Sequence, residues 1–519
     1  MLTSNSDTLL SRPDRRLAME IELKLALDAR QGPRLRRHPL LAGLKPQRRR
    51  LQSVYFDTPE FDLMKRAIAF RLRRVGYHWV QTLKAEARAV GALSSRPEWE
   101  MAVAGSDPDF AVMPAEAMAL LAKIDLSRLA PVFVTEFQRT TWLIESGGCV
   151  AELALDSGEI RAGEASKAIS EVEIELKSGS PEGLFGLARS LLDELPLRIE
   201  PRSKAERGYL LCEAISPAPV RAARPDIRPD QPAAEAWVGV TRAALVQLVA
   251  NVPGFLDHPE EIEYLHQLRI ALRRLRAAVG LGRSLGMARP AWSQALGEIM
   301  RGLNPARDWD VFLHETLPSV QAVLSEVLGD APVGEDMLNR ARQATLQARQ
   351  TAQGLIASPE FTRLVLDVGE SLHASPGDGG CAAEWAASLL DERWKKLRGL
   401  CGKLSDLGPG GRHEVRIAAK KLRYAADALE GLYGKRDGKR DGKRARTFIK
   451  RLAQLQDSLG RANDAYIATR LLEDMRHRNM ALAYDAGRIS GVVTDRVTHH
   501  GMASDSLWRR MAKSRVFWR

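Results

Sequence analysis

Charged side chains recur at every second position in six short segments of the first 210 residues. In the first segment, residues 19–25, Glu20, Glu22 and Lys24 alternate with apolar side chains. A β-strand sends alternate side chains to opposite faces, so this segment predicts a strand with one apolar and one charged face. Such a strand is either an ordinary solvated strand or one wall of a polar cavity that binds a charged ligand.

The other five segments repeat the alternation and favour the cavity. Their alternating polar residues are Arg71 and Arg73, Thr82 and Lys84, Glu98 and Glu100, Arg139 and Thr141, and the series Glu171, Glu173, Glu175 and Lys177. A solvated sheet face usually carries more Ser, Thr and Gln. Closing these strands into a barrel would place about a dozen charges of both signs in one lumen, which suits a highly charged ligand.

Four motifs, in this order, resemble the CYTH domain, or triphosphate tunnel metalloenzyme, superfamily. They are Glu-x-Glu-x-Lys at residues 20–24, Tyr-Phe-Asp-Thr-Pro at residues 55–59, the Arg71/Arg73 pair and Ser203-Lys204. The resemblance covers residues 19–214. It implies an antiparallel β tunnel that hydrolyses inorganic triphosphate to pyrophosphate and phosphate with the help of a divalent metal ion.

The tunnel would bind triphosphate through several cationic side chains, among which Arg has the fork geometry that matches phosphate oxygens. The candidates for this catalytic set are Lys24, Arg71, Arg73, Lys84, Arg139 and Lys204. Carboxylate oxygens are the ligands that Mg²⁺ and Mn²⁺ prefer. By the resemblance, the metal ligands would be Glu20, Glu22, Glu173 and Glu175.

Further acids are expected in the tunnel, namely Glu98, Glu100, Asp156 and Glu171. For the first three, two roles stay open. Each is a candidate general base, and each is an equally good partner that holds a neighbouring Arg in place. Neither a Gly-rich phosphate loop nor a histidine-based nucleophile is visible, so a P-loop mechanism is excluded.

After residue 232 the apolar residues recur with helical spacing, and one basic helix motif occurs twice. His266, Arg269, Arg273 and Arg276 lie on one stripe of the first helix, with Arg274 beside them; the second copy has His413, Arg416, Lys420, Lys421 and Arg423. Each copy precedes an Asp-containing turn, at Arg307-Asp308 and Asn463-Asp464. So many like charges on one stripe predict an anionic ligand.

This repeat resembles the CHAD domain, a duplicated helical module associated with inorganic polyphosphate. The resemblance covers residues 233–490 and implies that the two basic helices and Arg307 bind polyphosphate. One departure is Asn304-Pro305, where family members usually carry glycine, so we expect a displaced turn. Solvated faces are the alternative reading. Sequence-specific nucleic-acid binding is disfavoured, because the two helices contain only Tyr424 as an aromatic stacking platform.

Composition supports this division of the 519 residues into domains. Residues 233–519 carry 43 Lys+Arg against 33 Asp+Glu, a net charge of +10 out of +12, which predicts a polyanionic partner for the second part. Five prolines between residues 215 and 232 predict an extended linker. We expect a disordered extension over 1–18, helical halves over 233–374 and 381–490, a flexible loop over 434–444 and a basic tail over 491–519.

The predicted protein is therefore an α+β multidomain chain, with an N-terminal antiparallel β barrel and a C-terminal all-α duplicated bundle. Four cysteines without pairing or metal spacing fit a cytoplasmic location, and no apolar run predicts a membrane span. Association with polyphosphate granules follows from the expected ligand. Two alternatives to inorganic triphosphatase stay open: a non-catalytic polyphosphate-binding protein, and an enzyme acting on thiamine triphosphate or, as adenylate cyclase, on ATP. The sequence leaves the oligomeric state open.

Overall fold

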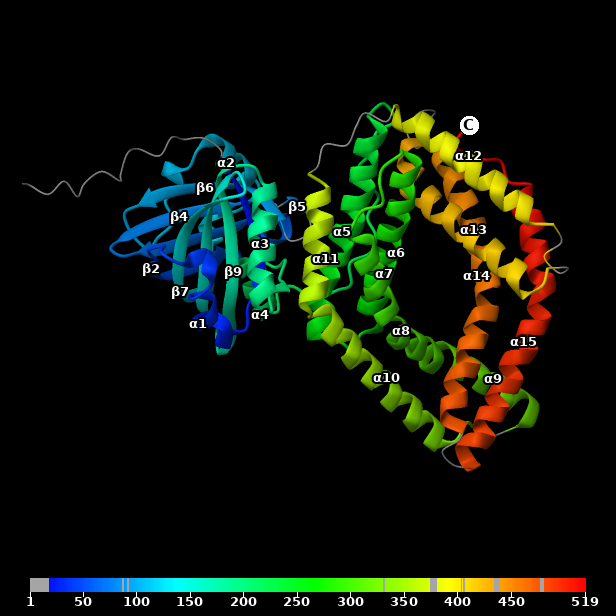
Figure 1. Ribbon diagram of the computed structural model, residues 1–519. Coiled ribbons are helices and arrows are strands. Elements are labelled where there is room, and N and C mark those ends of the chain that lie inside the picture. Colours follow the sequence, from blue (N-terminus) through cyan, green and yellow to red (C-terminus); the bar gives the residue numbers. More distant parts are fainter. Residues whose placement is uncertain are drawn as a thin grey trace, which may run out of the picture. The chain divides into compact units, whose positions relative to one another are not determined.

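The computed structural model divides into two compact units, residues 1–217 and 218–519, which are considered separately (Figure 1). The residues that the structure describes are 18–85, 88–90, 93–329, 332–373, 380–402, 404, 407–433, 439–476 and 480–519. The expected N-terminal extension therefore lies outside them except for its last residue. Residues 374–379 and 434–438, in the expected interhelical break and loop, also lie outside the described residues.

The first unit is a closed barrel of eight antiparallel strands. In chain order they are β1 (Ala18–Ala26), β2 (Gln47–Asp57), β3 (Ala69–Val75), β4 (His78–Lys84), β6 (Leu93–Val103), β7 (Ala130–Ser146), β8 (Cys149–Ala162) and β9 (Ala165–Gly179). Around the barrel the order is β1-β9-β8-β7-β2-β3-β4-β6, and β6 pairs with β1 to close the ring. Two short strands, β5 (Arg88–Val90) and β10 (Arg198–Ile199), extend β6 and β1. The predicted barrel is confirmed.

Alternation places the charged faces of these strands inside the barrel and their apolar faces under helices. On β3, Arg71 points into the lumen, whereas the neighbouring Leu72 is fully buried in a cluster with residues of α2 (Ala115–Leu121). The helix α3 (Glu182–Glu194) buries a stripe of Leu and Phe side chains beside β8 and β9 (Figure 1). The helix α4 (Lys204–Leu211) contacts β7, β8 and β9.

The second unit is helical. Its helices are α5 (Ala233–Asp257), α6 (Ile262–Ser284), α7 (Ser293–Gly302), α8 (Asn304–Val311), α9 (Leu317–Leu328), α10 (Glu335–Ile356), α11 (Pro359–Ser371), α12 (Ala382–Leu400), α13 (Pro409–Leu429), α14 (Lys439–Arg476) and α15 (Met480–Ala512). A π-helix, Phe312–Thr316, joins α8 to α9. The chain forms two helical pairs, α5 with α6 and α14 with α15, which lie side by side (Figure 1). In the first unit, the α1 turn (Gly32–Leu35) and several short 3₁₀ turns lie between the strands of the barrel.

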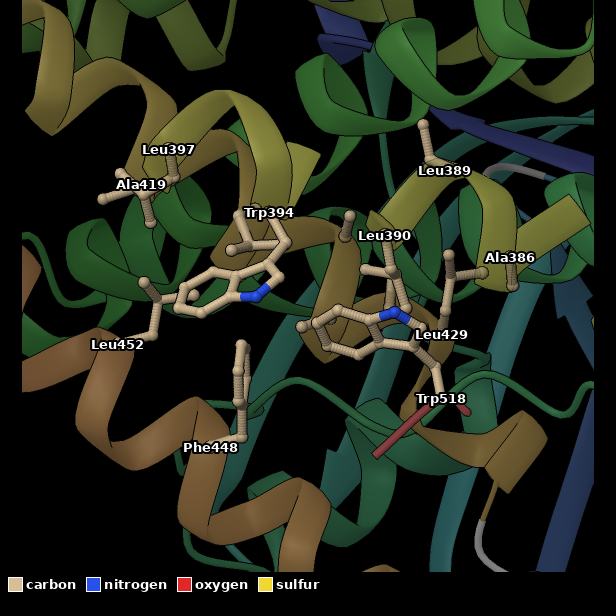
Figure 2. Close-up of a cluster of buried hydrophobic side chains, with 14 of the residues drawn as sticks. Ala386, Leu389, Leu390, Trp394, Leu397, Ala419, Leu429, Phe448, Leu452 and Trp518 are labelled. Atoms are coloured by element: carbon tan, nitrogen blue, oxygen red, sulfur yellow. The ribbon is translucent and has the colours of Figure 1, made fainter. Parts of the chain in front are cut away.

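The last thirty residues belong to the helical core. The helix α15 crosses the expected domain end at residue 490 without a break. Trp508 and Trp518 are buried, and the Trp518 ring packs edge-on against Phe448 with 5.1 Å between ring centroids (Figure 2). The Trp518 Nε1 also donates to the Asp391 carboxylate at 2.8 Å. The segment expected as a basic tail therefore closes the core of the second unit.

The proline-rich segment packs on the second unit from residue 218 onward. The backbone N–H of Val220 donates to the side chain of Asn251, and the Asn251 amide donates back to the Val220 carbonyl, both at 2.9 Å. Ile227 is buried in the helical core, and Pro232 pairs with Cys381. The expected extended linker thus forms part of a packed unit over most of its length.

One described helix, α5, is long and apolar enough to cross a membrane by length and composition. Two-thirds of its apolar window (67%) is buried inside the second unit. Burial of this extent is what a central helix of a protein core shows, and the other described helices do not meet the criterion.

Candidate active site

The lumen of the barrel is a cavity of about 700 Å³ lined by charges of both signs. Its basic residues are Lys24, Arg49, Arg71, Arg73, Lys84, Arg96, Arg139, Lys177 and Lys204. Its acidic residues are Glu20, Glu22, Glu98, Glu100, Glu152, Glu173 and Glu175. All six cations and all four metal ligands predicted from the sequence therefore line one cavity.

Strand register explains which of these residues meet. In the antiparallel pair of β1 and β9, Glu22 lies opposite Glu175, and Lys24 lies opposite Glu173. Directly opposite residues of two strands have adjacent side chains. Lys24 accordingly forms ion pairs with Glu22 at 3.6 Å and Glu173 at 3.7 Å. The first and the last charged strands of the sequence thus become neighbours in the barrel.

One group of ion pairs occupies the wall formed by β1, β4 and β6. Lys84 Nζ contacts both carboxylate oxygens of Glu20, at 2.9 and 2.8 Å, and contacts Glu98 at 3.0 Å. Arg96 bridges Glu20 at 2.8 Å and Glu22 at 2.9 Å. Despite the opposing effect of burial, Lys84 and Arg96 hold the pKa of Glu20 well below its ordinary value. Burial raises the pKa of Glu98.

A second group of ion pairs lies where β7, β8 and β9 meet α4. Arg139 binds Asp156 through two hydrogen bonds, at 2.8 and 2.6 Å, and also contacts Glu173. Lys204 contacts Asp156 at 2.7 Å, Glu173 at 2.8 Å and also Glu171. Asp156 and Glu171 are fully buried and stand behind the lining of the cavity. These two acids, expected among the tunnel residues, are partners of cations.

Glu98 and Glu100, the other acids with two open roles, also contact cations. Arg71 lies 3.7 Å from Glu98 and 3.8 Å from Glu100, and Thr82 donates to Glu100 at 3.3 Å. The structure therefore supports the role of Arg-holding partner for these acids and for Asp156.

Arg73 is the least neutralised of the six predicted cations. Arg73 donates to the Ser53 hydroxyl at 3.0 Å, and among the described residues no carboxylate lies within 4.0 Å of it. Burial, together with repulsion from Arg71 and Arg139, lowers the pKa of Arg73 to about 10. Although burial acts in the opposite direction, Arg71 and Arg73 also lower the pKa of the neighbouring Tyr55 hydroxyl. A half-buried guanidinium without a counter-ion suits the binding of an anion.

The acids offer two places for a divalent cation. Among the described residues, the one group of three acids whose oxygens lie within 4.8 Å of one another is Asp156, Glu171 and Glu173. Lys204 already contacts all three, so a metal ion there would have to displace its ammonium group. Glu22 and Glu175 face the open lumen instead, and each contacts its lysine or arginine neighbours through Oε1. Burial raises the pKa of Glu175, which a cation beside it would reverse.

The sequence analysis missed several residues of the site. Arg96 shares the alternating face of Glu98 and Glu100, but Pro97 beside it reads as a strand breaker. Arg207 binds Glu171 from the second turn of α4, where strand alternation gives no signal. Arg49 of β2 and Glu152 of β8 also line the lumen and were not predicted.

The second unit has a basic cavity of about 620 Å³. It brings together five residues predicted from the duplicated motif: Arg269, Arg273 and Arg276 from α6, and Lys420 and Lys421 from α13. Its lining also includes three arginines and an asparagine that were not predicted, namely Arg283, Arg289, Arg301 and Asn304. Burial, followed by repulsion from the surrounding arginines, lowers the pKa of Lys420 to about 8.

Asn304, where the sequence departs from the expected glycine, has a defined contact in this cavity. Its side-chain oxygen accepts a hydrogen bond from Arg269 at 2.9 Å. The turn lies at Leu303, between α7 and α8, with Pro305 in the first turn of α8, a position where proline is well tolerated. Asn304 thus fixes one of the guanidinium groups of the basic cavity.

The other predicted polyphosphate ligands lie outside the lining of this cavity. His266, Arg307, His413, Arg416 and Arg423 are not part of it, although Arg416 is close enough to Lys420 to lower its pKa. Burial and repulsion from Arg307 lower the pKa of His266. Arg274 points away: it donates to Gln247 at 2.8 Å and to the carbonyl of Ala223 at 3.0 Å. Arg274 therefore contacts the proline-rich segment and does not line the basic cavity.

Comparison with known proteins agrees with both units. Residues 18–209 match the model of the CYTH domain, and residues 239–473 match that of the CHAD domain. Residues 18–209 form a CYTH domain, and residues 239–473 form a CHAD domain. Over 197 residues it is 36% identical to an inorganic triphosphatase of Haemophilus influenzae, a region that is 38% of this chain and 55% of that relative. The chain thus spans about half the length of the curated relative it matches.

Two solved structures are also similar. The crystal structure of the CHAD domain from the plant Ricinus communis has 27% identity and covers 57% of this chain and 98% of its own, with a TM-score of 0.49. The crystal structure of an inorganic triphosphatase has 19% identity and covers 33% of this chain and 81% of its own, with a TM-score of 0.15.

Proposed function

We propose that the CYTH barrel hydrolyses inorganic triphosphate to pyrophosphate and phosphate, and that the CHAD domain binds inorganic polyphosphate. The observation that carries the first part is Arg73, a half-buried guanidinium group of the lumen that has no carboxylate partner among the described residues and lies beside the buried Arg71. The 36% identity of the barrel region to an inorganic triphosphatase supports the same reaction.

The lumen residues would act by positioning and by charge. Arg71, Arg73 and Arg139 would bind the phosphate oxygens. Lys84 and Lys204 would also bind them once the substrate displaces their carboxylate partners. In phosphoryl transfer, charge on the equatorial oxygens is stabilised by such fixed cations. Lys24 lies between Glu22 and Glu173, so it would keep these carboxylates apart and oriented.

Glu20, Glu22 and Glu175 fit a divalent cation, because they are carboxylates that face the open lumen on adjacent strands. We assign them, with Glu173, as the ligands of Mg²⁺ or Mn²⁺. When bound, the ion would polarise a phosphate oxygen and orient water. Glu173 is the weakest member of this set, since Arg139, Lys204 and Lys24 all contact it.

Phosphate release tests the reaction. The full chain is incubated with tripolyphosphate, ATP or thiamine triphosphate, each with Mg²⁺, with Mn²⁺ or with chelator. We expect tripolyphosphate to be the best substrate and chelator to abolish turnover. Preference for ATP or thiamine triphosphate would move the assignment to an organic triphosphate, and no turnover of any of them would leave a binding protein.

Polyphosphate binding rests on the basic cavity between α6 and α13. Charge reversal at Arg273 and Lys420 together should abolish retention of a long polyphosphate chain by the full protein, while tripolyphosphate hydrolysis persists. A matched control reverses Arg342 and Lys396, exposed cations outside both cavities. Retention that survives the first double variant, or fails equally in the second, would contradict this assignment. The proposal places the protein in the cytoplasm, where polyphosphate granules would be its target.

A further inference from the structure

A second cavity, of about 300 Å³, continues the lumen at one end of the barrel. The two cavities share Glu22, Lys24, Ala69, Lys84, Arg96, Ser203 and Ala205, so they are two parts of one passage. Seven shared residues from β1, β3, β4, β6 and α4 form the junction. The passage therefore has two ends, and the strands show which residues lie at each.

The near end lies where β3 finishes and β4 begins. Arg73 and His78 line the larger cavity there, together with Arg49 from the start of β2 and Lys177 from the end of β9. The far end lies where β6 begins and where α4 packs. Leu93 and Glu206 line only the smaller cavity there.

The two ends differ in charge and polarity. Cations predominate at the near end. At the far end, the lining that is not shared with the larger cavity has no Lys or Arg among the described residues and includes the carboxylates of Glu200 and Glu206. The rest of that lining is mostly apolar: Met64, Ala67, Ile68, Ala85, Leu93, Pro201, Tyr209 and Ile215.

The two far-end carboxylates are not equivalent. Glu200 is bound by the Arg202 guanidinium through hydrogen bonds of 3.0 Å to both of its oxygens. Glu206 stands exposed in the first turn of α4, two residues from Lys204 of the lumen. The negative charge of Glu206 therefore lies where a phosphate chain leaving the lumen would have to pass.

We propose that Glu206 and the apolar far end act as a stop that limits the length of phosphate chain the tunnel accepts. This inference rests on the proposed triphosphatase function. A polyanion enters from the basic near end until its leading phosphate reaches the junction at Lys84, Arg96 and Lys24. Further movement would bring that phosphate against Glu206, in a lining that adds no Lys or Arg among the described residues. In a chain longer than the lumen, the remaining phosphates therefore stay outside the near end without cationic partners. Such a chain cannot pass through the tunnel.

The test compares tripolyphosphate with hexapolyphosphate in the full chain and in Glu206→Gln and Glu206→Lys. The ratio of kcat/KM for the longer chain to that for tripolyphosphate should rise about fivefold in Glu206→Gln. It should rise about twenty-five-fold in Glu206→Lys, since reversal doubles the free-energy change of removing one charge. Glu182→Gln is the control, because Glu182 lies in the first turn of α3 and lines neither cavity of the passage.

Equilibrium binding of both chains in chelator separates this inference from the proposed reaction. All variants carry the same CHAD domain, so differences in affinity report the barrel. If the ratio of affinity for hexapolyphosphate to that for tripolyphosphate rises from wild type to Glu206→Gln to Glu206→Lys, but no protein hydrolyses either chain, the proposed reaction is overturned and the stop is supported. Hydrolysis of tripolyphosphate with unchanged ratios in both measurements would overturn the stop and leave the reaction standing.

Discussion

The cations of the lumen differ in how completely neighbouring carboxylates neutralise their charge. Lys84 and Arg96 share Glu20, and Lys204 is enclosed by Asp156, Glu171 and Glu173. Arg73, by contrast, has only a hydroxyl. Because a buried charge is costly unless it is paired, the paired cations are stable without substrate, whereas Arg73 gains most from an arriving phosphate.

Replacement of Glu22 tests the metal assignment. Glu22→Gln keeps the shape of the side chain but weakens it as a metal ligand, so the rate of tripolyphosphate hydrolysis should fall at least about a hundredfold. Affinity for tripolyphosphate in chelator should persist or rise, since a negative charge has left the lumen. Glu152→Gln, in the same lumen, is the control. Near-normal turnover of Glu22→Gln at saturating Mg²⁺ would remove Glu22 from the ligand set.

Replacement of Lys204 tests the buried ion-pair group. Lys204→Met leaves Asp156, Glu171 and Glu173 with one cation fewer, which should cost about 3–5 kcal/mol at pH 7. In the wild type, although burial opposes it, Lys204 and Arg139 lower the pKa of Glu173, so this stabilisation is present above about pH 4.5 and lost as the pH falls.

In the variant, Glu173 keeps Arg139 and Lys24 but loses Lys204, so its pKa in the folded state should lie closer to its ordinary value. The deficit relative to wild type should therefore be full at pH 7 and shrink as the pH falls below about 4.5. Amide hydrogen exchange of β8 and β9 in the full chain, with exposed Lys45→Met as control, measures it. A deficit that grows on acidification would contradict the assigned ion pairs.

At the scale of elements, α4 controls the lumen because it supplies Lys204 and lies against the barrel. A Cβ atom at Gly208 would come within 2.2 Å of the buried Phe133 ring of β7. Gly208→Ala should therefore destabilise the barrel by about 1–3 kcal/mol and lower turnover by moving Lys204. Gly186→Ala in α3, where nothing lies within 4 Å, should be neutral or slightly stabilising. Equal stability of the two variants would show that α4 shifts freely.

The packing of α6 against α13 creates a titrating lysine. The pKa of Lys420 is about 8 because of burial and of repulsion from Arg273, Arg416, Arg276 and Arg269. A polyanion favours the charged form, so polyphosphate affinity should be constant below about pH 8 and fall above it, by up to about tenfold per pH unit. Lys420→Arg should stay flat over this range. Parallel profiles for both proteins, measured at fixed ionic strength, would exclude Lys420 from the binding cavity.

Period-two alternation predicted the strands of the barrel and five of its six cations, because the strands are long and their lumen faces are almost wholly charged; the sixth, Lys204, lies in α4 and came from the Ser203-Lys204 motif of the resemblance. It could not place Asp156 and Glu171 behind the lining, since that depends on α4, which brings Lys204 and Arg207 to them. Helical periodicity likewise predicted the basic stripe of α6. It did not predict that Arg274, which follows Arg273 of that stripe, donates to the carbonyl of Ala223 instead. Such contacts come from segments distant in the sequence.

At the scale of the whole molecule, the two charge systems differ in kind. The barrel balances cations with acids inside one lumen, whereas the CHAD domain gathers Arg269, Arg273, Arg276 and Lys420 with few acids around them. A balanced lumen suits a short chain that must be held with a metal ion and released after cleavage. An unbalanced basic cavity suits retention of a long polyanion, with steep dependence on salt.

The unit boundary falls at residue 217 rather than at residue 232, which leads to a prediction about fragments. Within residues 218–232, the backbone of Val220 forms two hydrogen bonds with the side chain of Asn251, and Ile227 is buried in the core. The carbonyl of Gln231 also accepts from Ala382 at 2.9 Å. A fragment that starts at 233 loses these contacts, and each buried polar group left without a partner costs about 1–3 kcal/mol.

We therefore expect residues 218–519 to be more stable in urea than residues 233–519 by about 3 kcal/mol or more, because Asn251 and Ala382 lose partners and the apolar side chain of Ile227 is removed. Residues 1–217 alone should fold and hydrolyse tripolyphosphate, since the barrel closes on itself. Asn251→Ala in residues 218–519 gives the matched single-site comparison. Equal stability of the two helical fragments would show that the proline-rich segment is only a connection, with no part in the fold it packs against.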